Sequence, residues 1–231
     1  MSQVLAGKKI VVTGGFGALG RATGNALLEA GAQVALVDRA RTPSDLQDCA
    51  QAWGEVDLLD PGTTRLCMAA VAERFGGVDG LVNIAGGFMW ETVESGNAET
   101  WDLMYRMNVR TALLSSQAAL PHLLRSGAGR IVNVGAASAT QAGTGMGAYA
   151  ASKAGVARLT EAMAEEFKDR GVIVNVVLPS IIDTPANRAA MPDADATRWV
   201  DAAALARVIV FLQSEAAAPI TGALIPVKGL V

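Results

Sequence analysis

Short apolar runs rich in β-branched residues alternate along this chain with longer segments of helical length. The runs occupy residues 9–13, 33–38, 54–59, 79–86, 130–135, 172–177 and 223–227, and Ala- and Leu-rich segments occupy 18–31, 63–76, 100–127, 148–171 and 201–214. Apolar strands that lead into helices are typical of a parallel sheet buried on both faces. The pattern predicts a single doubly wound α/β domain over residues 1–231, with about seven parallel strands and helices on both faces.

Glycines and prolines mark the ends of these segments. Gly31, Gly127 and Gly171 each follow a helical segment and precede an apolar run, where glycine accepts the left-handed backbone that ends many helices. Residues 179–199 form a long interruption of the pattern and contain several prolines. Such length is typical of a functional loop, so we expect a substrate loop there and not a domain boundary.

Composition excludes several classes of partner. With a net charge of −3, the chain has no basic surplus that would indicate nucleic acid or an acidic membrane surface. Cys49, Cys67 and the single histidine, His122, are too few for a zinc site or a disulfide framework, which predicts no metal and free thiols. The start lacks a signal-peptide core and no apolar run is long enough to span a membrane, so we expect a soluble cytoplasmic protein.

A glycine-rich turn directly follows the first apolar run. Gly15, Gly17 and Gly20 have the spacing G-x-G-x-x-G where the first helical segment begins. This spacing permits a tight turn and brings backbone N–H groups to a pyrophosphate at the positive helix end. The alternative is a turn that only packs a helix on a strand. We predict that the turn binds a dinucleotide through Gly14, Gly15, Phe16, Gly17, Ala18, Leu19 and Gly20.

An acidic residue ends the second apolar run. Asp38 lies about twenty residues beyond the glycines, where a carboxylate accepts hydrogen bonds from both hydroxyls of the adenosine ribose. The same charge repels a 2′-phosphate, which favours NAD over NADP as the cofactor. Arg39 and Arg41 follow and offer the alternative, because they could hold that phosphate. No basic residue precedes Arg21 in the glycine turn, which also favours NAD.

A tyrosine and a lysine stand four residues apart in the segment AYAASKAGVARL. Tyr149 and Lys153 therefore share one face of the expected helix. A nearby ammonium, and a positive nicotinamide ring, favour the phenolate and so lower the pKa of a tyrosine. This predicts a tyrosine that exchanges a proton at neutral pH. The pair alone indicates no more than an amphipathic helix face, and the dinucleotide turn upstream favours the catalytic interpretation.

Together these features resemble the short-chain dehydrogenase/reductase family, a Rossmann fold, over essentially the whole chain. The pieces that match are TGGFGALG at 13–20, Asp38, VDLLD at 56–60, NIAG at 83–86, Asn108 and YAASK at 149–153. The resemblance implies that Tyr149 is the general acid/base, that Lys153 holds the nicotinamide ribose, and that Asn108 supports a water relay. It also implies cofactor contacts by Asp38, Arg39, Asp57, Leu58, Ala85, Gly86, Pro179, Ile182 and Thr184.

The chain departs from the family pattern at the serine that orients the substrate. That serine normally stands thirteen residues before the tyrosine, where this chain has Ala136. Ser138 is only eleven residues before Tyr149. Ser138 either reaches the same space through a shorter loop, as a catalytic residue, or is a small loop residue. The family's Asn-Asn-Ala-Gly also reads Asn-Ile-Ala-Gly here, and its Pro-Gly after the sixth strand reads Pro-Ser.

A narrower resemblance within the family concerns the loops. The stretches GGFGALG, GTGMGAYAASKAGV and 183–199 are similar to dihydropteridine reductase, which uses NADH, keeps the tyrosine and lysine, and lacks the serine. Phe88, Met89 and Trp90 are expected to floor a substrate pocket, and Trp199 to cover it. The resemblance also implies a homodimer or homotetramer.

Three functions remain open from the sequence. The first is an NAD(H)-dependent oxidoreductase that transfers a hydride between nicotinamide and a small-molecule carbonyl or alcohol. The second is a reductase of quinonoid dihydropteridines. The third, from another class, is a non-catalytic nucleotide-binding scaffold or sensor, against which the joint presence of Tyr149, Lys153 and Asn108 argues.

Overall fold

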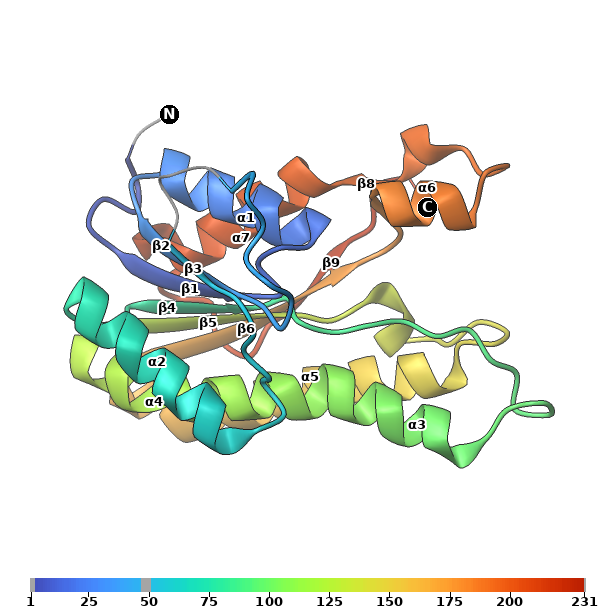
Figure 1. The fold of residues 1–231 in the computed structure, drawn as a ribbon, viewed down its shortest axis with the longest axis horizontal. Helices are drawn as coiled ribbons and strands as arrows, with labels where there is room; N and C mark the ends of the chain where they lie inside the picture. Colours follow the sequence, from blue (N-terminus) through green and yellow to red (C-terminus); the bar gives the residue numbers. More distant parts are fainter. Residues whose placement is uncertain (1–2, 47–50, 231) are drawn as a thin grey trace.

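The computed structural model describes residues 3–46 and 51–230 and contains a parallel sheet of seven strands (Figure 1). The strands lie in the order β3-β2-β1-β4-β5-β6-β9. Their bounds are β1 Lys9–Thr13, β2 Gln33–Val37, β3 Gln51–Trp53, β4 Gly80–Asn83, β5 Gly129–Val134, β6 Val172–Pro179 and β9 Leu224–Val227. The doubly wound α/β prediction with seven parallel strands is confirmed.

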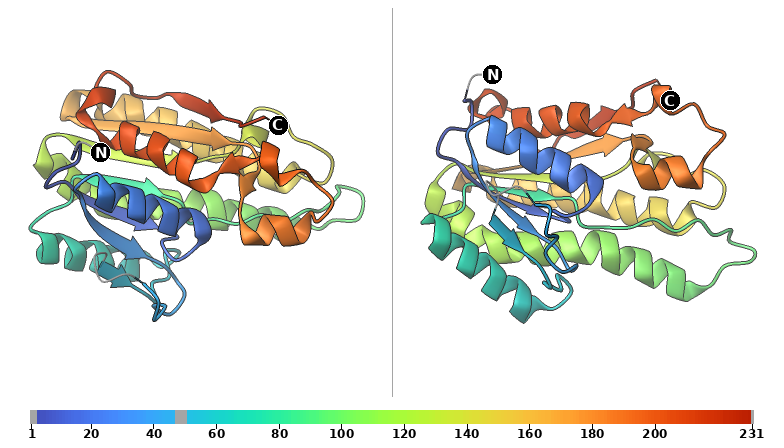
Figure 2. Two further views of the ribbon diagram at one scale, coloured as in Figure 1. Left: turned by 90° about the horizontal axis from the view of Figure 1, so that it is seen from above. Right: turned by 45° about the horizontal axis from the view of Figure 1, so that its top comes forward.

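Helices cover both faces of this sheet. Helices α1 (Ala18–Glu29) and α7 (Ala202–Gln213) pack side by side on one face (Figure 2). On the other face lie α2 (Pro61–Phe75), α4 (Thr111–Ser126) and α5 (Gly147–Phe167), and α3 (Ala98–Tyr105) packs against α5. Alternate strand residues enter two separate apolar cores, one on each side of the sheet.

The third strand lies earlier in the sequence than the apolar pattern predicts. The predicted strand at 54–59 is a loop, and β3 ends at Trp53. Glu55 has a φ of +60°, a conformation that a regular strand cannot contain. Val56 and Leu58 are still buried, which explains why this loop has the apolar pattern of a strand.

Two other segments differ from expectation. The helix predicted at 100–127 contains a π-helical turn, Arg106–Arg110, between α3 and α4. The expected loop at 179–199 carries β7 (Ile182–Asp183), α6 (Pro185–Ala190) and a 3₁₀ turn, Ala196–Arg198. Strand β7 pairs in parallel with β8, Val200–Asp201. This segment is therefore a folded subregion beside the carboxyl edge of the main sheet (Figure 1).

The glycine positions behave as predicted, and the thiols agree where they are described. Gly31, Gly127 and Gly171 have φ values of +94°, +69° and +74° at helix ends.

Cys67 is free and buried, and burial raises the pKa of its thiol to about 11, while Cys49 lies outside the described residues. Within 3–46 and 51–230, no cluster of His, Cys, Asp or Glu could hold a metal ion. No helix of those residues has the length and apolarity to cross a membrane.

The glycine turn between β1 and α1 brings three elements into close contact. Gly14 has a φ of +67°, and a Cβ on it would lie 2.8 Å from the Ala85 backbone nitrogen beyond β4. A Cβ on Gly20 would lie 2.2 Å from the Gly14 carbonyl oxygen. No side chain fits at these two positions, so the turn fixes the start of α1 against β1 and the end of β4.

We expect Gly20→Ala to destabilise the fold and Gly17→Ala to leave its stability almost unchanged. The methyl group at position 20 overlaps the Gly14 carbonyl, and such overpacking costs about 1–3 kcal/mol. Gly17 is the matched control, because its Cβ position has no atom nearer than 3.5 Å and its φ is −73°. Urea unfolding followed by tryptophan fluorescence measures both free energies of unfolding. Equal stability of the two variants would contradict this packing.

Candidate active site

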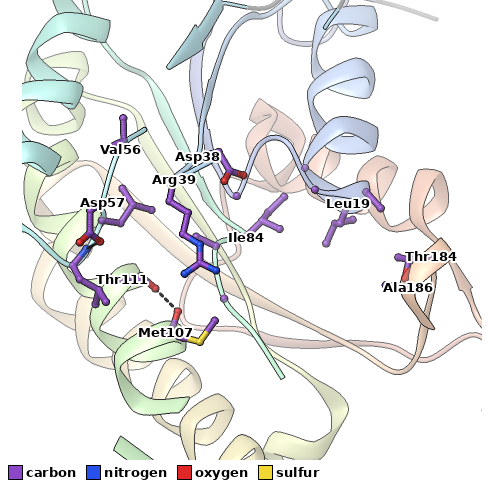
Figure 3. A pocket seen from close by; sticks show the side chains of 18 of the residues that line it. Leu19, Asp38, Arg39, Val56, Asp57, Ile84, Met107, Thr111, Thr184 and Ala186 are labelled. Atoms are coloured by element: carbon purple, nitrogen blue, oxygen red, sulfur yellow. Dashed lines mark hydrogen bonds between the residues drawn. The ribbon is translucent and has the colours of Figure 1, made fainter. Parts of the chain in front are cut away.

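A cleft opens at the carboxyl ends of the strands, where the chain order reverses between β1 and β4 (Figure 3). Parallel α/β sheets bind ligands at such a switch point. The cleft has a volume of about 570 Å³. Its walls are Gly14, Gly17, Ala18, Leu19, Gly20, Asp38, Arg39, Val56, Asp57, Leu58, Leu59, Ile84, Ala85, Gly86, Met107, Thr111, Thr184, Pro185 and Ala186.

The amino-terminal end of α1 faces this cleft without an acceptor of its own. Its N-cap, Gly17, makes no side-chain cap hydrogen bond, and the first turn contains no acidic residue. The backbone N–H groups of such a turn and the helix dipole favour an anion. Because side chains are also excluded at Gly14 and Gly20, the turn fits a dinucleotide pyrophosphate.

Asp38 stands at the edge of the cleft with its carboxylate fixed by two backbone amides. Phe16 N–H donates to Oδ2 over 3.1 Å, and Ala40 N–H donates to Oδ1 over 3.0 Å. Each carboxylate oxygen retains acceptor capacity for another donor. The carboxylate is thus fixed in position and can still accept hydrogen bonds from a ligand in the cleft.

The first basic residue after the glycine turn is occupied by an ion pair. Arg21 makes a bidentate contact with Asp45, with both N···O distances 3.0 Å, and its Nε donates to the Phe16 carbonyl over 3.1 Å. The contact raises the pKa of the Arg21 guanidinium and lowers that of the Asp45 carboxyl. Arg39, by contrast, lines the cleft directly (Figure 3).

Most of the predicted cofactor residues line the cleft, and a few do not. Gly15 is buried against Leu36, and Phe16 serves Asp38 through its backbone. Pro179 is buried at the end of β6, and Ile182 belongs to β7. The residues that the sequence analysis did not identify are Val56, Leu59, Ile84, Met107, Thr111, Pro185 and Ala186. Three of them, Val56, Leu59 and Ile84, lie within the matched family pieces at 56–60 and 83–86, which was a usable signal.

Lys153 is buried between α5 and the end of β5. Lys153 is only 6% exposed, and its Nζ donates to the Val134 carbonyl over 2.8 Å. Burial disfavours the ammonium and lowers the pKa of Lys153 to about 8. A Cβ on Gly86 would lie 3.6 Å from Nζ. The cleft and the lysine therefore meet at Gly86.

Tyr149 lies on the same helix face, as predicted, but its pKa moves in the opposite direction. The Lys153 ammonium is 5.9 Å from the tyrosine ring centroid. Burial nevertheless raises the pKa of Tyr149 to about 12, because removal from water disfavours the phenolate. In the protein without cofactor, the ammonium alone does not produce the lower pKa that we expect from the ammonium and the nicotinamide ring together. Tyr149 is a neutral phenol at neutral pH.

Asn108 lies in the π-helical turn, where its side chain joins the segment after β4 to helix α5. Its Nδ2 donates to the Gly87 carbonyl over 3.1 Å and to Ser152 Oγ over 2.9 Å, and its Oδ1 accepts from Gly87 N–H over 3.0 Å. Ser152 Oγ in turn donates to the Tyr149 carbonyl over 2.7 Å. Asn108 therefore positions both the strand end beside the cleft and the tyrosine helix. Sequence reasoning did not single out Ser152.

The two candidates for the serine position lie two residues apart in the segment after β5. Ala136 is buried and directly precedes the 3₁₀ turn Ala137–Ala139. Ser138 lies within that turn, and its Oγ is buried without a hydrogen-bond partner among the described residues. An unsatisfied buried hydroxyl is uncommon. The turn is packed against α5, which carries Tyr149.

Comparison with known proteins agrees with this arrangement. A family model described as short chain dehydrogenase matches residues 8–195. The chain is 33% identical to a 3-oxoacyl-(acyl-carrier-protein) reductase of Vibrio cholerae, over 97% of each chain. It is 32% identical to a 2,5-dichloro-2,5-cyclohexadiene-1,4-diol dehydrogenase of Sphingobium indicum, over 99% of this chain and 98% of the other.

Solved structures show the same fold. The ligand-free aldohexose dehydrogenase of Thermoplasma acidophilum superposes with a TM-score of 0.90 at 25% identity, covering 100% of this chain and 96% of the other. The protein named gox2181 superposes with a TM-score of 0.91 at 27% identity, covering 98% of this chain and 96% of that one.

The buried lysine generates a pH-dependent stability. Its pKa is about 8 in the folded protein and 10.5 ordinarily, so between these values the unfolded chain binds more protons at this residue. The free energy of unfolding contributed by Lys153 therefore rises with pH across that window. We expect the difference in this free energy between the unmodified protein and Lys153→Met to grow in favour of the lysine from pH 8 to pH 9.5. Parallel pH dependences in chemical denaturation would refute the shift.

Proposed function

Because the chain belongs to the short-chain dehydrogenase family, and is thus an oxidoreductase with a nicotinamide dinucleotide cofactor, we propose that it uses NAD(H) with a small-molecule carbonyl or alcohol. When bound, the cofactor supplies or accepts the hydride. The observation that carries the proposal is the convergence of the cleft and the Tyr149–Lys153 pair at Gly86. A scaffold that only binds nucleotides has no use for a tyrosine beside the buried ammonium at that point.

The preference for NAD rests on the charges at the ribose end of the cleft. The Asp38 carboxylate offers acceptors to ribose hydroxyls and repels a 2′-phosphate. Arg21, which could offset that repulsion, is held by Asp45 on one side and by the Phe16 carbonyl on the other. Arg39 is the cationic residue in the cleft wall, and binding of NADP would have to depend on it.

Proton transfer falls to Tyr149 in this proposal. The neutral phenol donates its proton from Oη to the oxygen of a carbonyl as that group becomes an alcohol. Lys153, fixed by the Val134 carbonyl, places an ammonium beside the tyrosine and stabilises the phenolate that results. Hydrogen bonds of Asn108 and Ser152 hold helix α5, which carries the tyrosine, beside Gly86 and Gly87 in the segment after β4.

A second candidate function is suggested by Ala136. Its methyl group cannot donate a hydrogen bond to a substrate oxygen, and it stands where the family's serine does. A quinonoid dihydropteridine needs a proton on a polarised ring system and less orientation of one carbonyl oxygen, which suits this site. The names of the relatives extend from a 3-oxoacyl-(acyl-carrier-protein) reductase to a dehydrogenase of a dichlorinated cyclohexadiene diol, and these names favour neither candidate. Parallel assays of NADH oxidation with quinonoid dihydropterin, ketones and aldehydes distinguish the two candidates.

The cofactor preference is testable at Asp38. We expect the unmodified protein to bind NADH more tightly than NADPH, and Asp38→Ala to narrow or reverse that preference. Charge-assisted hydrogen bonds of a carboxylate contribute about 1.5–3 kcal/mol, so the affinity for NADH should fall by roughly tenfold to a hundredfold. Fluorescence titration with both cofactors measures the dissociation constants. Tighter binding of NADPH to the unmodified protein would overturn the NAD assignment.

The proton-transfer role is testable at Tyr149. We expect Tyr149→Phe to keep NADH affinity and to lose turnover by about 10²–10⁴-fold, which is typical for removal of a general acid/base. Ser138→Ala is the comparison, because we assign Ser138 an auxiliary polar contact whose loss changes turnover by less than about tenfold.

Unchanged turnover in Tyr149→Phe would favour a different acid or the scaffold function. A loss in Ser138→Ala equal to that in Tyr149→Phe would show that Ser138 is the catalytic serine and would argue against the dihydropteridine alternative.

A further inference from the structure

Three large apolar side chains remain exposed directly beyond the cleft. Phe88, Met89 and Trp90 follow Gly86 and Gly87 and are 54%, 40% and 61% exposed. The Phe88 ring contacts the Tyr149 ring edge to face, with 4.9 Å between centroids and 85° between planes. We call Phe88, Met89 and Trp90 the aromatic ledge. It begins at the tyrosine assigned to proton transfer.

The ledge is fixed in place by the loop that precedes α5. Trp90 Nε1–H donates to the Thr144 carbonyl over 3.0 Å, and Glu91 N–H donates to the Gly145 carbonyl over 2.8 Å. Gly145 has a φ of +72°, and a Cβ on it would lie 2.1 Å from the Trp90 ring. The exposure of these side chains is therefore a property of a built surface, and both loops extend from the same end of the sheet (Figure 1).

Apart from the buried Lys153 ammonium beside Tyr149, the charges of the segments that form the ledge are acidic. Residues 86–97 and 136–147, the two segments that meet there, contain Glu91 and Glu94 and neither lysine nor arginine. A substrate carboxylate or phosphate bound on this surface would meet repulsion and no partner from these segments. An uncharged substrate avoids that cost.

The neighbouring segment at 180–199 does not compensate. Arg188 contacts Asp183 with two nitrogens, at 2.6 and 2.7 Å, and Arg198 Nη2 donates to the Leu230 carbonyl over 2.8 Å. Both guanidinium groups therefore have partners within the chain. Trp199, expected from the sequence to cover the pocket, is buried.

We propose that the aromatic ledge binds an uncharged, flat ring of the substrate, so that the substrates are neutral aryl or cyclic ketones and the corresponding alcohols. Aromatic rings bind other rings by stacking and by edge contacts, and their apolar area adds to the affinity. Carboxylates and phosphate-bearing thioesters are disfavoured by the acidic segments. This assignment rests on the proposed function, because it places the reacting carbonyl at Tyr149.

The test uses acetophenone and its charged counterpart, 4-acetylbenzoate, with NADH and the full chain. We expect a kcat/KM for acetophenone at least about tenfold higher, since the two differ in one carboxylate. Phe88→Ala and Trp90→Ala should each raise KM for acetophenone by about tenfold, the scale for removal of one ring contact and its area, with unchanged affinity for NADH. Trp90→Phe should recover most of the Trp90→Ala loss, because it restores a ring.

Leu66→Ala is the control, since Leu66 is 74% exposed on α2 and does not line the cleft. Its kinetics should match those of the unmodified protein. Equal or better use of 4-acetylbenzoate, or the same KM in Phe88→Ala, Trp90→Ala and Leu66→Ala, would overturn the proposal.

A binding measurement separates this proposal from the proposed function. Saturation-transfer NMR with acetophenone and NADH-loaded Tyr149→Phe should detect binding that weakens when Phe88→Ala is added. If binding depends on the ledge but the unmodified protein does not turn acetophenone over, the result would contradict the oxidoreductase assignment at Tyr149 and support ring binding by the ledge. If the unmodified protein turns acetophenone over and the ledge variants change neither binding nor KM, the result would support the oxidoreductase assignment and contradict ring binding by the ledge.

Discussion

Burial of the Lys153 ammonium is the interaction on which the rest of the site depends. A charge removed from water is costly unless hydrogen bonds compensate it, and the Val134 carbonyl provides one at the end of β5. That bond ties α5 to the sheet edge, next to Gly86, where the dinucleotide cleft ends. The same burial that lowers the lysine pKa raises that of Tyr149. Burial at this point therefore affects both where Lys153 and Tyr149 lie and which protonation state each prefers.

Hydrogen bonds between buried polar side chains fix helix α5 relative to strands β4 and β5. Asn83 on β4 donates to Ser116 and to Asn133 on β5, and Asn133 donates to Thr160 on α5. Asn108 forms a second bridge, from Gly87 to the tyrosine helix. Because buried polar groups are costly without partners, such satisfied networks permit one relative placement of strands and helices. The strand end at Gly86, the lysine and the tyrosine are thereby held in one arrangement.

The sequence predicted the parts of this molecule that depend on local chemistry. Apolar periodicity located the strands, and the glycine spacing located the cleft. The apolar pattern misplaced β3. The positive φ of Glu55 accompanies a hydrogen bond from its N–H to the Ala40 carbonyl, and residue type does not predict it. The sequence also did not show that the pKa of Tyr149 is raised in the protein without cofactor, since the sequence shows the neighbouring ammonium and not the depth of burial. The ion pair of Arg21 with Asp45 joins residues whose spacing carries no known signal.

We infer that Tyr149 is a neutral phenol in the free protein and loses its proton readily only when the positive charge of an oxidised nicotinamide lies beside it. The chain has two tyrosines, so Tyr105→Phe leaves Tyr149 as the sole source of tyrosinate absorbance near 295 nm. We expect no tyrosinate signal in the free Tyr105→Phe protein at pH 10, where an unperturbed tyrosine is half ionised, because the pKa of Tyr149 is about 12. Lys153, with a pKa of about 8, is largely neutral at that pH, so the positive nicotinamide ring is the charge beside the phenol, and saturating NAD⁺ should produce the signal. Half-ionisation at pH 10 without NAD⁺, or no change when NAD⁺ binds, would contradict it.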